Sequence, residues 1–163
     1  MSKSRERRRG GGGVREMIEL DSCIIGNFKS LNEFTLDFSK FTCLIGLNSA
    51  GKSTILQSLD FISQQMKGDI SGWLKSRNWE AKELKCKFIN NKYIILTLLY
   101  NYKQKNYIWN FIFNPLEKKS THEEIVYFPS LDSEKSKIIF EVKASKYMID
   151  KDGEIKKGDI IVY

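Results

Sequence analysis

The sequence predicts an α/β fold in which a phosphate-binding loop joins a strand to a helix, with a large antiparallel β portion after that helix. Three observations favour this class. Gly46, Gly51, Lys52 and Ser53 occupy the fixed positions of the motif G-x-x-x-x-G-K-[ST]. An apolar run ends at the first glycine, and apolar residues follow the motif at helical spacing. Beyond the helix, short runs with alternating apolar and polar residues are separated by turn residues, which is typical of antiparallel strands.

The loop carries the residue types that a nucleoside triphosphate needs. Glycines let the backbone turn tightly and bring its N–H groups close to phosphate oxygens. The helix that follows directs its positive N-terminal end at the same anion. We expect Lys52 to reach the β- and γ-phosphates and the Ser53 hydroxyl to ligate Mg²⁺. The predicted nucleotide-binding residues of the loop are Gly46, Leu47, Asn48, Ser49, Ala50, Gly51, Lys52, Ser53 and Thr54. The alternative is a glycine turn between a strand and a helix that binds no nucleotide.

Composition indicates a globular chain. The 163 residues are 41% hydrophobic and 12% aromatic, which argues against a disordered protein. No apolar run approaches the ~18 residues that a membrane-spanning helix needs, and no apolar segment follows the first arginines as in a secretory signal. Cys23, Cys43 and Cys86 are widely spaced, and the first two lie in apolar, strand-like runs where cysteine acts as a small hydrophobe. A reducing cytoplasm is the expected location.

The net charge of +7 is concentrated at one end of the chain. Residues 1–16 hold six basic and two acidic side chains, a net of +4, so the other 147 residues carry only +3. Arginines followed by four glycines predict a basic, disordered tail over 1–16, ahead of a globular region over 17–163. A nucleic-acid-binding arm is the alternative interpretation of the tail.

Ordered structure is expected to begin near Met17. A first strand is predicted over 17–26 and onward to 31, a half-buried second strand over 34–38, and a buried third strand over 41–45. Two antiparallel strands before the loop are informative, because simple α/β nucleotide-binding folds place the loop after their first strand. The helix should run from Lys52 to about Met66 and end at Lys67-Gly68, with Gly68 suited to the position just after the helix.

The second half is predicted to be rich in β-strands. A short helix and a loop are expected over 69–83, where two tryptophans lie among polar residues. Strands are then predicted over 84–89, 93–100, 107–113, 124–128, 137–142, 147–150 and 159–163. Tyr107, Trp109, Phe111 and Phe113 should share one strand face. We interpret that face as packed against a neighbouring element, although an aromatic face can also stack nucleic-acid bases.

The segments 24–31, 34–38 and 44–54 together resemble the amino-terminal signature of ABC-type ATPases of the SMC/RecF/OLD-like group. Those proteins carry "NF[KR]S" at the end of a first strand and a phosphate loop of the form G-x-N-x-x-G-K-[ST]. The stretch 68–74 and the β-rich segment after it are more narrowly similar to the ATPases of bacterial defence systems such as Septu and OLD. The resemblance implies a P-loop NTPase fold of ABC type, with 17–163 as the N-terminal half of the ATPase head.

Two further residue roles are implied by the resemblance. Asn48 matches the loop asparagine that lies beside the phosphates. Lys29 matches the basic residue after "NF" that approaches the nucleotide from the first strand. From the residues alone, Lys29 could equally be a surface lysine at a strand end.

The catalytic motifs of the family cannot be placed in the sequence. A glutamine loop, an L-S-x-G signature, an aliphatic strand ending in Asp-Glu and a switch histidine are all absent or unidentifiable. His122 is expected in a solvated loop, and Gln104 in a hairpin turn. No catalytic residue is therefore predicted, and the chain is expected to be the N-terminal half of a longer head.

The resemblance implies binding of ATP with Mg²⁺. It also implies ATP-driven pairing with a second ATPase head, and hydrolysis coupled to work on DNA or on a partner nuclease, as in anti-phage defence. The isolated chain is expected to hydrolyse ATP at close to the background rate. Two alternatives stay open: a nucleotide-sensing scaffold without turnover, and a nucleic-acid-binding β module that merely carries a glycine loop.

Overall fold

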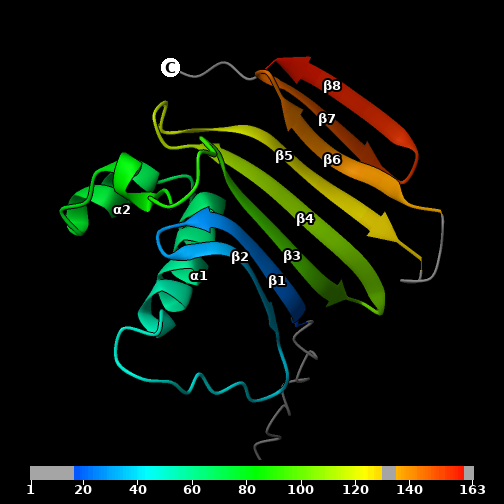
Figure 1. Ribbon diagram of the computed structural model, residues 1–163. Coiled ribbons are helices and arrows are strands. Elements are labelled where there is room, and N and C mark those ends of the chain that lie inside the picture. Colours follow the sequence, from blue (N-terminus) through cyan, green and yellow to red (C-terminus); the bar gives the residue numbers. More distant parts are fainter. Residues whose placement is uncertain (1–16, 130–134, 160–163) are drawn as a thin grey trace, which may run out of the picture.

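A computed structural model describes residues 17–129 and 135–159, which form one large antiparallel sheet with helices at one end (Figure 1). The sheet has eight strands in the order β2-β1-β3-β4-β5-β6-β7-β8, and every neighbouring pair is antiparallel. The strands are β1 (Glu19–Phe28), β2 (Leu31–Asp37), β3 (Ile94–Tyr102), β4 (Lys105–Asn114), β5 (Lys119–Phe128), β6 (Lys137–Lys143), β7 (Lys146–Lys151) and β8 (Glu154–Asp159). The expected antiparallel β portion is present. The part of the chain described here contains no parallel pair, so the expected α/β layout is seen only as a sheet with flanking helices.

Strands β1 and β2 form a hairpin around a tight turn at Lys29-Ser30. Ile25 faces Phe34 in the hairpin register, and Lys29 adopts a φ of 51°. Strand β1 also pairs with β3, so it lies inside the sheet while β2 forms its edge. The predicted antiparallel pair ahead of the loop is confirmed.

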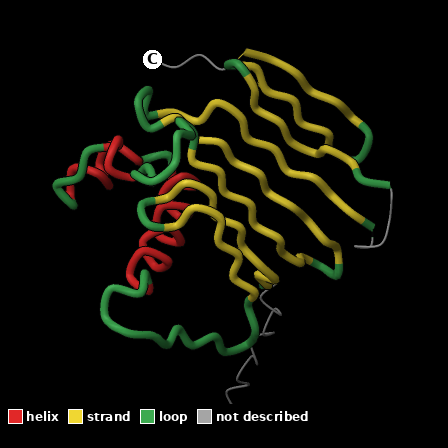
Figure 2. The backbone as a smooth tube through the Cα atoms, in the orientation of Figure 1, coloured by secondary structure: helices red, strands yellow, loops and turns green. Residues whose placement is uncertain are grey.

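Helix α1 (Lys52–Lys67) follows the loop and packs on one face of the sheet (Figure 2). Its end matches the prediction, because Gly68 takes a left-handed conformation with a φ of 78° and its amide reaches the carbonyls of Gln64 and Gln65. Phe61 is fully buried, with its ring 5.5 Å from that of Phe28 and 5.3 Å from that of Phe113. Burial of this helix face organises the core.

Two short elements follow α1, as expected for residues 69–83. Helix α2 (Ile70–Ser76) begins at Asp69, whose carboxylate accepts a hydrogen bond from the Gly72 amide, and a 3₁₀ turn, η1 (Ala81–Leu84), lies beyond it. None of the described helices is long and apolar enough to cross a membrane.

The aromatic face of β4 belongs to the core, as interpreted from the sequence. Trp109, Phe111 and Phe113 are all buried beneath the helical layer. Further along the strand, the Tyr107 ring lies 5.3 Å from that of Tyr100 and 5.6 Å from that of Tyr127. These rings are engaged with one another and with the core rather than arranged as a free stacking platform.

Two strand predictions were wrong. Residues 41–45 form no strand, because no described segment pairs with them. Residues 84–89 also form no strand: only Lys85 makes an isolated antiparallel bridge, to Phe28 at the end of β1. A strand that was not predicted, β8, immediately follows the turn at Asp152-Gly153, and of the predicted strand over 159–163 all but Asp159 lies outside the described residues.

Two side-chain environments also differ from expectation. His122 lies within β5 rather than in a loop, because β5 begins at Lys119 and is paired on both sides. Cys43 is exposed, whereas Cys23 is buried as expected and its pKa is raised to about 11, mainly by that burial. The predicted basic tail over 1–16 and the residues 160–163 lie outside the described part of the chain.

Candidate functional site

The loop between β2 and α1 is organised around the amine of Lys52. Its Nζ donates hydrogen bonds to the backbone carbonyls of Gly46 and Leu47, each at 2.7 Å. The Ala50 amide donates to the Leu47 carbonyl at 3.2 Å, which closes a turn within the loop. The loop backbone therefore curls around the ammonium group, and the positive charge stands where the chain enters the helix.

No described side chain accepts a hydrogen bond from the backbone amides in the first turn of α1. Gly51 is the N-terminal capping residue with a φ of 90°, and without a side chain it makes no capping hydrogen bond. Ser49 also takes a positive φ, 68°, and the first turn of the helix contains no acidic residue. Among the described residues these amides therefore have no side-chain acceptor, and the helix dipole adds positive potential there. Such a helix end suits a phosphate group.

The β1–β2 turn is docked beside the loop. Ser30 Oγ donates to Thr54 Oγ1 at 3.2 Å, and a β-carbon at Gly51 would lie 3.8 Å from the same Ser30 oxygen. The hairpin turn and the start of α1 are thus neighbours, although the chain between them is long. This contact brings the "NFKS" segment to the loop, as the resemblance implies.

Lys29 lies on this turn and its amine is already engaged. Nζ donates to Gln57 Oε1 at 2.9 Å and stands 3.1 Å from the centre of the Trp79 ring. Burial lowers the pKa of Lys29; the nearby Glu83 carboxylate opposes that shift, and Arg77 adds to it. The contacts of Lys29 therefore join the hairpin to α1 and to the segment after α2.

A cluster at the junction of α1 and α2 was not predicted from the sequence. The Asp60 carboxylate accepts a hydrogen bond from Trp73 Nε1 at 2.9 Å and pairs with the Arg77 guanidinium. The pKa of Asp60 is lowered, first by the Trp73 hydrogen bond. The signal for this cluster in the sequence is Asp60, an acidic residue among the apolar positions of α1. The cluster fixes α2 against the helix that carries Lys52.

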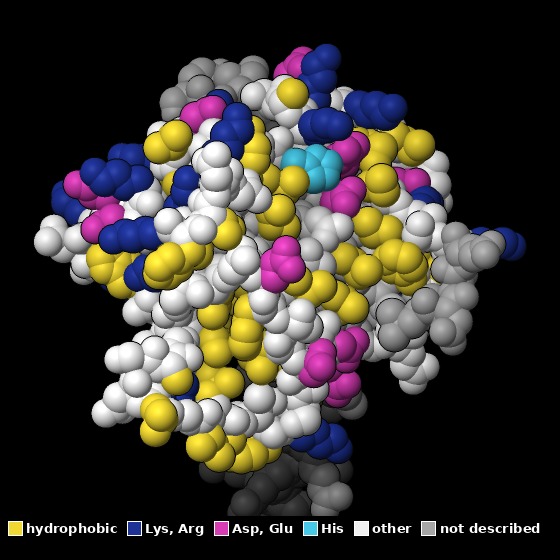
Figure 3. Space-filling view, in the orientation of Figure 1, with side chains coloured by type: hydrophobic (Ala, Val, Ile, Leu, Met, Phe, Trp, Pro, Cys, Tyr) yellow, Lys and Arg dark blue, Asp and Glu magenta, His cyan; other side chains and the backbone are white. Residues whose placement is uncertain are grey.

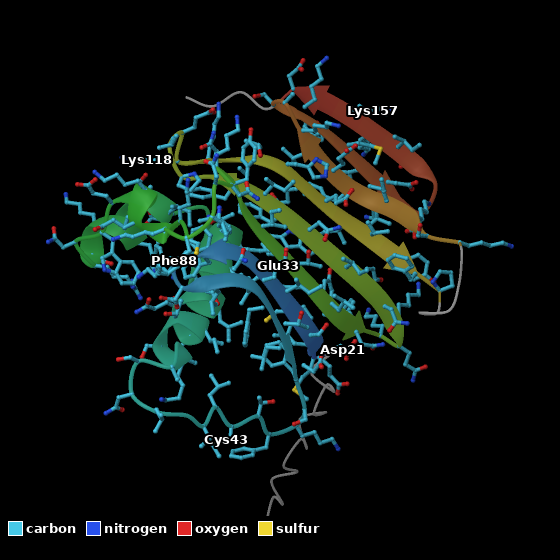
Figure 4. The ribbon with its side chains drawn as sticks, viewed as in Figure 1. Asp21, Glu33, Cys43, Phe88, Lys118 and Lys157 are labelled. Atoms are coloured by element: carbon cyan, nitrogen blue, oxygen red, sulfur yellow. The ribbon has the colours of Figure 1, made fainter. Side chains whose placement is uncertain are left out.

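The segment that leads into the loop is extended and largely exposed. Phe41, Ile45 and Leu47 expose 84%, 90% and 85% of their surface. Figure 4 shows Cys43 on this segment, which runs apart from the sheet. Of the apolar residues that predicted a buried strand, only Leu44 is partly buried against the core.

Comparison with known families identifies the domain. A family model described as an AAA ATPase domain, AAA_15, matches residues 18–161, which covers the hairpin, the loop, α1 and the strands that follow. The chain belongs to the AAA ATPase domain family. Membership implies ATP binding and, generally, the use of Mg²⁺. No curated protein matches the chain.

The other candidate residues of this AAA ATPase domain lie away from the loop. Gln104 takes a φ of 61° in the tight turn between β3 and β4, as expected for a hairpin turn. His122 faces Ile112 of β4, so it points to the sheet face opposite the buried Phe111 and Phe113 and therefore opposite α1. Neither residue is brought to Lys52, and the described residues reveal no general base for hydrolysis.

Proposed function

We propose that this AAA ATPase domain binds Mg-ATP in the loop Gly46–Thr54. The observation that carries the proposal is the Lys52 ammonium, held by two loop carbonyls at the uncapped N-terminal end of α1. A bound triphosphate would take over the ammonium from those carbonyls, and the amides of the helix end would donate to its oxygens. Ser53 is exposed at the second residue of the helix and supplies the hydroxyl for Mg²⁺.

Two flanking residues complete the proposed site. Asn48 lies in the loop and is assigned to the phosphates, as in the ATPases that the sequence resembles. Lys29 is assigned to the nucleotide from the β1–β2 turn, which the hydrogen bond between Ser30 and Thr54 holds beside the loop. Its hydrogen bond to Gln57 places the amine against α1, the helix that begins with Lys52.

We further propose that ATP drives the association of two such heads, in an ATPase of the SMC/RecF/OLD-like group that acts on DNA or on a partner nuclease, as in anti-phage defence. The exposed Phe41, Ile45 and Leu47 beside the loop support a surface that another protein layer covers. The nucleic-acid-binding β module is less well supported, because Trp109, Phe111 and Phe113 are buried. Residues 17–163 then act as the nucleotide-binding half of the head.

Calorimetric titration with Mg-ATP tests the binding site. Lys52→Ala removes charge-assisted contacts worth about 1.5–3 kcal/mol, which corresponds to a loss of affinity of about tenfold to two-hundredfold. Lys67→Ala, at the opposite end of the same helix, is the matched control and should bind like the wild type. Ser53→Ala should weaken the dependence of binding on Mg²⁺. Equal affinity of the wild type and Lys52→Ala would overturn the assignment.

Sedimentation velocity and phosphate release test the head hypothesis. With Mg-ATP the chain should shift toward a dimer, and Lys52→Ala should not. Turnover should stay near the background rate, because the described residues place no water-activating base beside the loop. Absence of any nucleotide-dependent association would refute the pairing of heads. Lys52-dependent turnover near ~1 s⁻¹, within the ordinary range of enzymes, would show that the catalytic base is present.

A further inference from the structure

The sheet face opposite α1 carries a cluster of side chains that is unrelated to the nucleotide loop. His122 and Glu124 lie two residues apart on β5, and Glu141 lies on the neighbouring strand β6. One potential ligand atom from each residue lies within 4.8 Å of the other two. In Figure 3 the one histidine, in cyan, lies beside acidic side chains on this face.

The register of the two strands sets two like charges against each other. Glu124 and Glu141 are direct partners across β5 and β6. Carboxylates in such a pair repel one another, and the pairing is unfavourable unless a cation lies between them. The His122 ring stands between the two groups, with Nε2 3.5 Å from Glu124 Oε2 and Nδ1 4.0 Å from Glu141 Oε1. These groups are partly buried, with between a fifth and a third of each side chain exposed.

Neighbouring strands hold one of the carboxylates in place. Asn110 Nδ2 donates to Glu124 Oε1 at 2.8 Å, and Thr97 Oγ1 donates to Asn110 Oδ1 at 2.8 Å. This ladder crosses β3, β4 and β5 and leaves Glu124 Oε2, the oxygen that faces the imidazole, free of the Asn110 amide. Ligand carboxylates in metal sites are oriented by hydrogen bonds of this kind.

We propose that His122, Glu124 and Glu141 bind a divalent transition-metal ion of the zinc class. One imidazole and two carboxylates are ligands that Zn²⁺ accepts, with bonds of about 2.0–2.2 Å. In a tetrahedral site such bonds separate the ligand atoms by about 3.4 Å, close to the 3.5 Å between His122 Nε2 and Glu124 Oε2. Three protein ligands leave a fourth position for water. The ion would join β5 to β6 and would neutralise the pair of facing carboxylates.

The competing interpretation is that basic side chains beside Glu124 and Glu141 already offset the repulsion between the two carboxylates without a metal. The backbone partner of His122 in the β5–β6 register is Lys143, and the imidazole lies within 4.0 Å of a carboxylate oxygen of each glutamate. The two interpretations differ in what added Zn²⁺ does to the imidazole. Because the chain has a single histidine, its nitrogen resonances report on this site alone.

The test is a titration of ¹⁵N-labelled chain with ZnCl₂, without nucleotide, followed by the imidazole nitrogen resonances. A Cys43→Ser background is used, because Cys43 is an exposed thiol that could bind zinc separately. The imidazole resonances should shift and saturate near one equivalent of Zn²⁺. Imidazole resonances that do not move at tenfold excess would overturn the proposal.

Matched variants assign the ligands. Glu124→Gln and Glu141→Gln keep the side-chain shape and should each weaken binding by more than tenfold, and Asn110→Ala should weaken it by about 10–100-fold. Glu33→Gln removes an exposed carboxylate from β2 on the same sheet face and should bind Zn²⁺ like the parent. Circular dichroism confirms that each variant is folded. Wild-type zinc affinity in folded Glu141→Gln would refute the site.

Discussion

The centre of the core provides the sharpest prediction about stability. Phe61 on α1 is fully buried and contacts three aromatic rings. Its ring centre lies 5.5 Å from that of Phe28 on β1, 5.5 Å from that of Trp73 on α2 and 5.3 Å from that of Phe113 on β4. Phe61→Ala would therefore loosen the hairpin, α2 and the middle of the sheet at once.

The expected cost of Phe61→Ala is the lost burial plus the cavity that the ring leaves. Such substitutions cost about 3–5 kcal/mol, and each well-placed aromatic pair adds about 0.5–1.5 kcal/mol beyond buried area. Because the three neighbouring rings come from three different elements, they cannot all collapse into the space together. We therefore expect the upper part of the range, about 4–5 kcal/mol.

Urea unfolding followed by far-ultraviolet circular dichroism measures this change. With a slope of about 2 kcal/mol per molar urea, the midpoint should fall by about 2 M. Phe88→Ala is the control, because Phe88 exposes 87% of its surface and its loss should change stability by less than about 0.5 kcal/mol. A loss below about 1 kcal/mol for Phe61→Ala, or equal losses for the two variants, would refute this description of the core.

Three other predictions concern single side chains. Asn27→Ala should cost about 3 kcal/mol in the same urea assay, because the buried amide donates to two backbone carbonyls and accepts from a backbone amide. The pKa of Asp60 is lowered in the folded state, so its contribution to stability is present above the pKa of the unfolded chain and is lost as pH falls through the pKa of the folded state. Asp60→Asn should therefore reduce the fall in the free energy of unfolding at acid pH. An unchanged fall in this variant would contradict the assignment. A thiol reagent at pH 8 should label the exposed Cys43 rapidly and the buried Cys23 and Cys86 slowly. Cys43→Ser should abolish the rapid phase of labelling. A rapid phase that survived in this variant would contradict the burial of Cys23 and Cys86.

Features fixed by local chemistry could be predicted from the sequence. The bounds of α1 follow from the glycine at each end, since Gly51 and Gly68 both take left-handed conformations. The antiparallel hairpin and the buried face of β4 follow from alternation alone. The phosphate-loop motif also predicted the position of Lys52 at the start of a helix.

Features that depend on distant partners could not be predicted. The apolar pattern of residues 41–45 signals burial, yet only Leu44 is partly buried against the core, and Phe41 and Ile45 are exposed. His122 lies in a polar run that looks like a loop, but pairing with β4 and β6 makes it a strand. Asn27 belongs to the "NFKS" segment. Only the structure reveals that its side chain forms hydrogen bonds with the backbone of Cys86 and Tyr93 and so joins that part of the chain to the end of β1.

The most direct test of the central claim is nuclear magnetic resonance of the ¹⁵N-glycine-labelled chain during titration with Mg-ATP. The amides of Gly46 and Gly51 should shift strongly, because they belong to the loop that we propose binds the phosphates. The amide of Gly153, in the turn between β7 and β8, should stay in place. The shifts should vanish in Lys52→Ala. Glycine shifts confined to Gly153, or loop shifts that persist unchanged in Lys52→Ala, would contradict nucleotide binding at this loop.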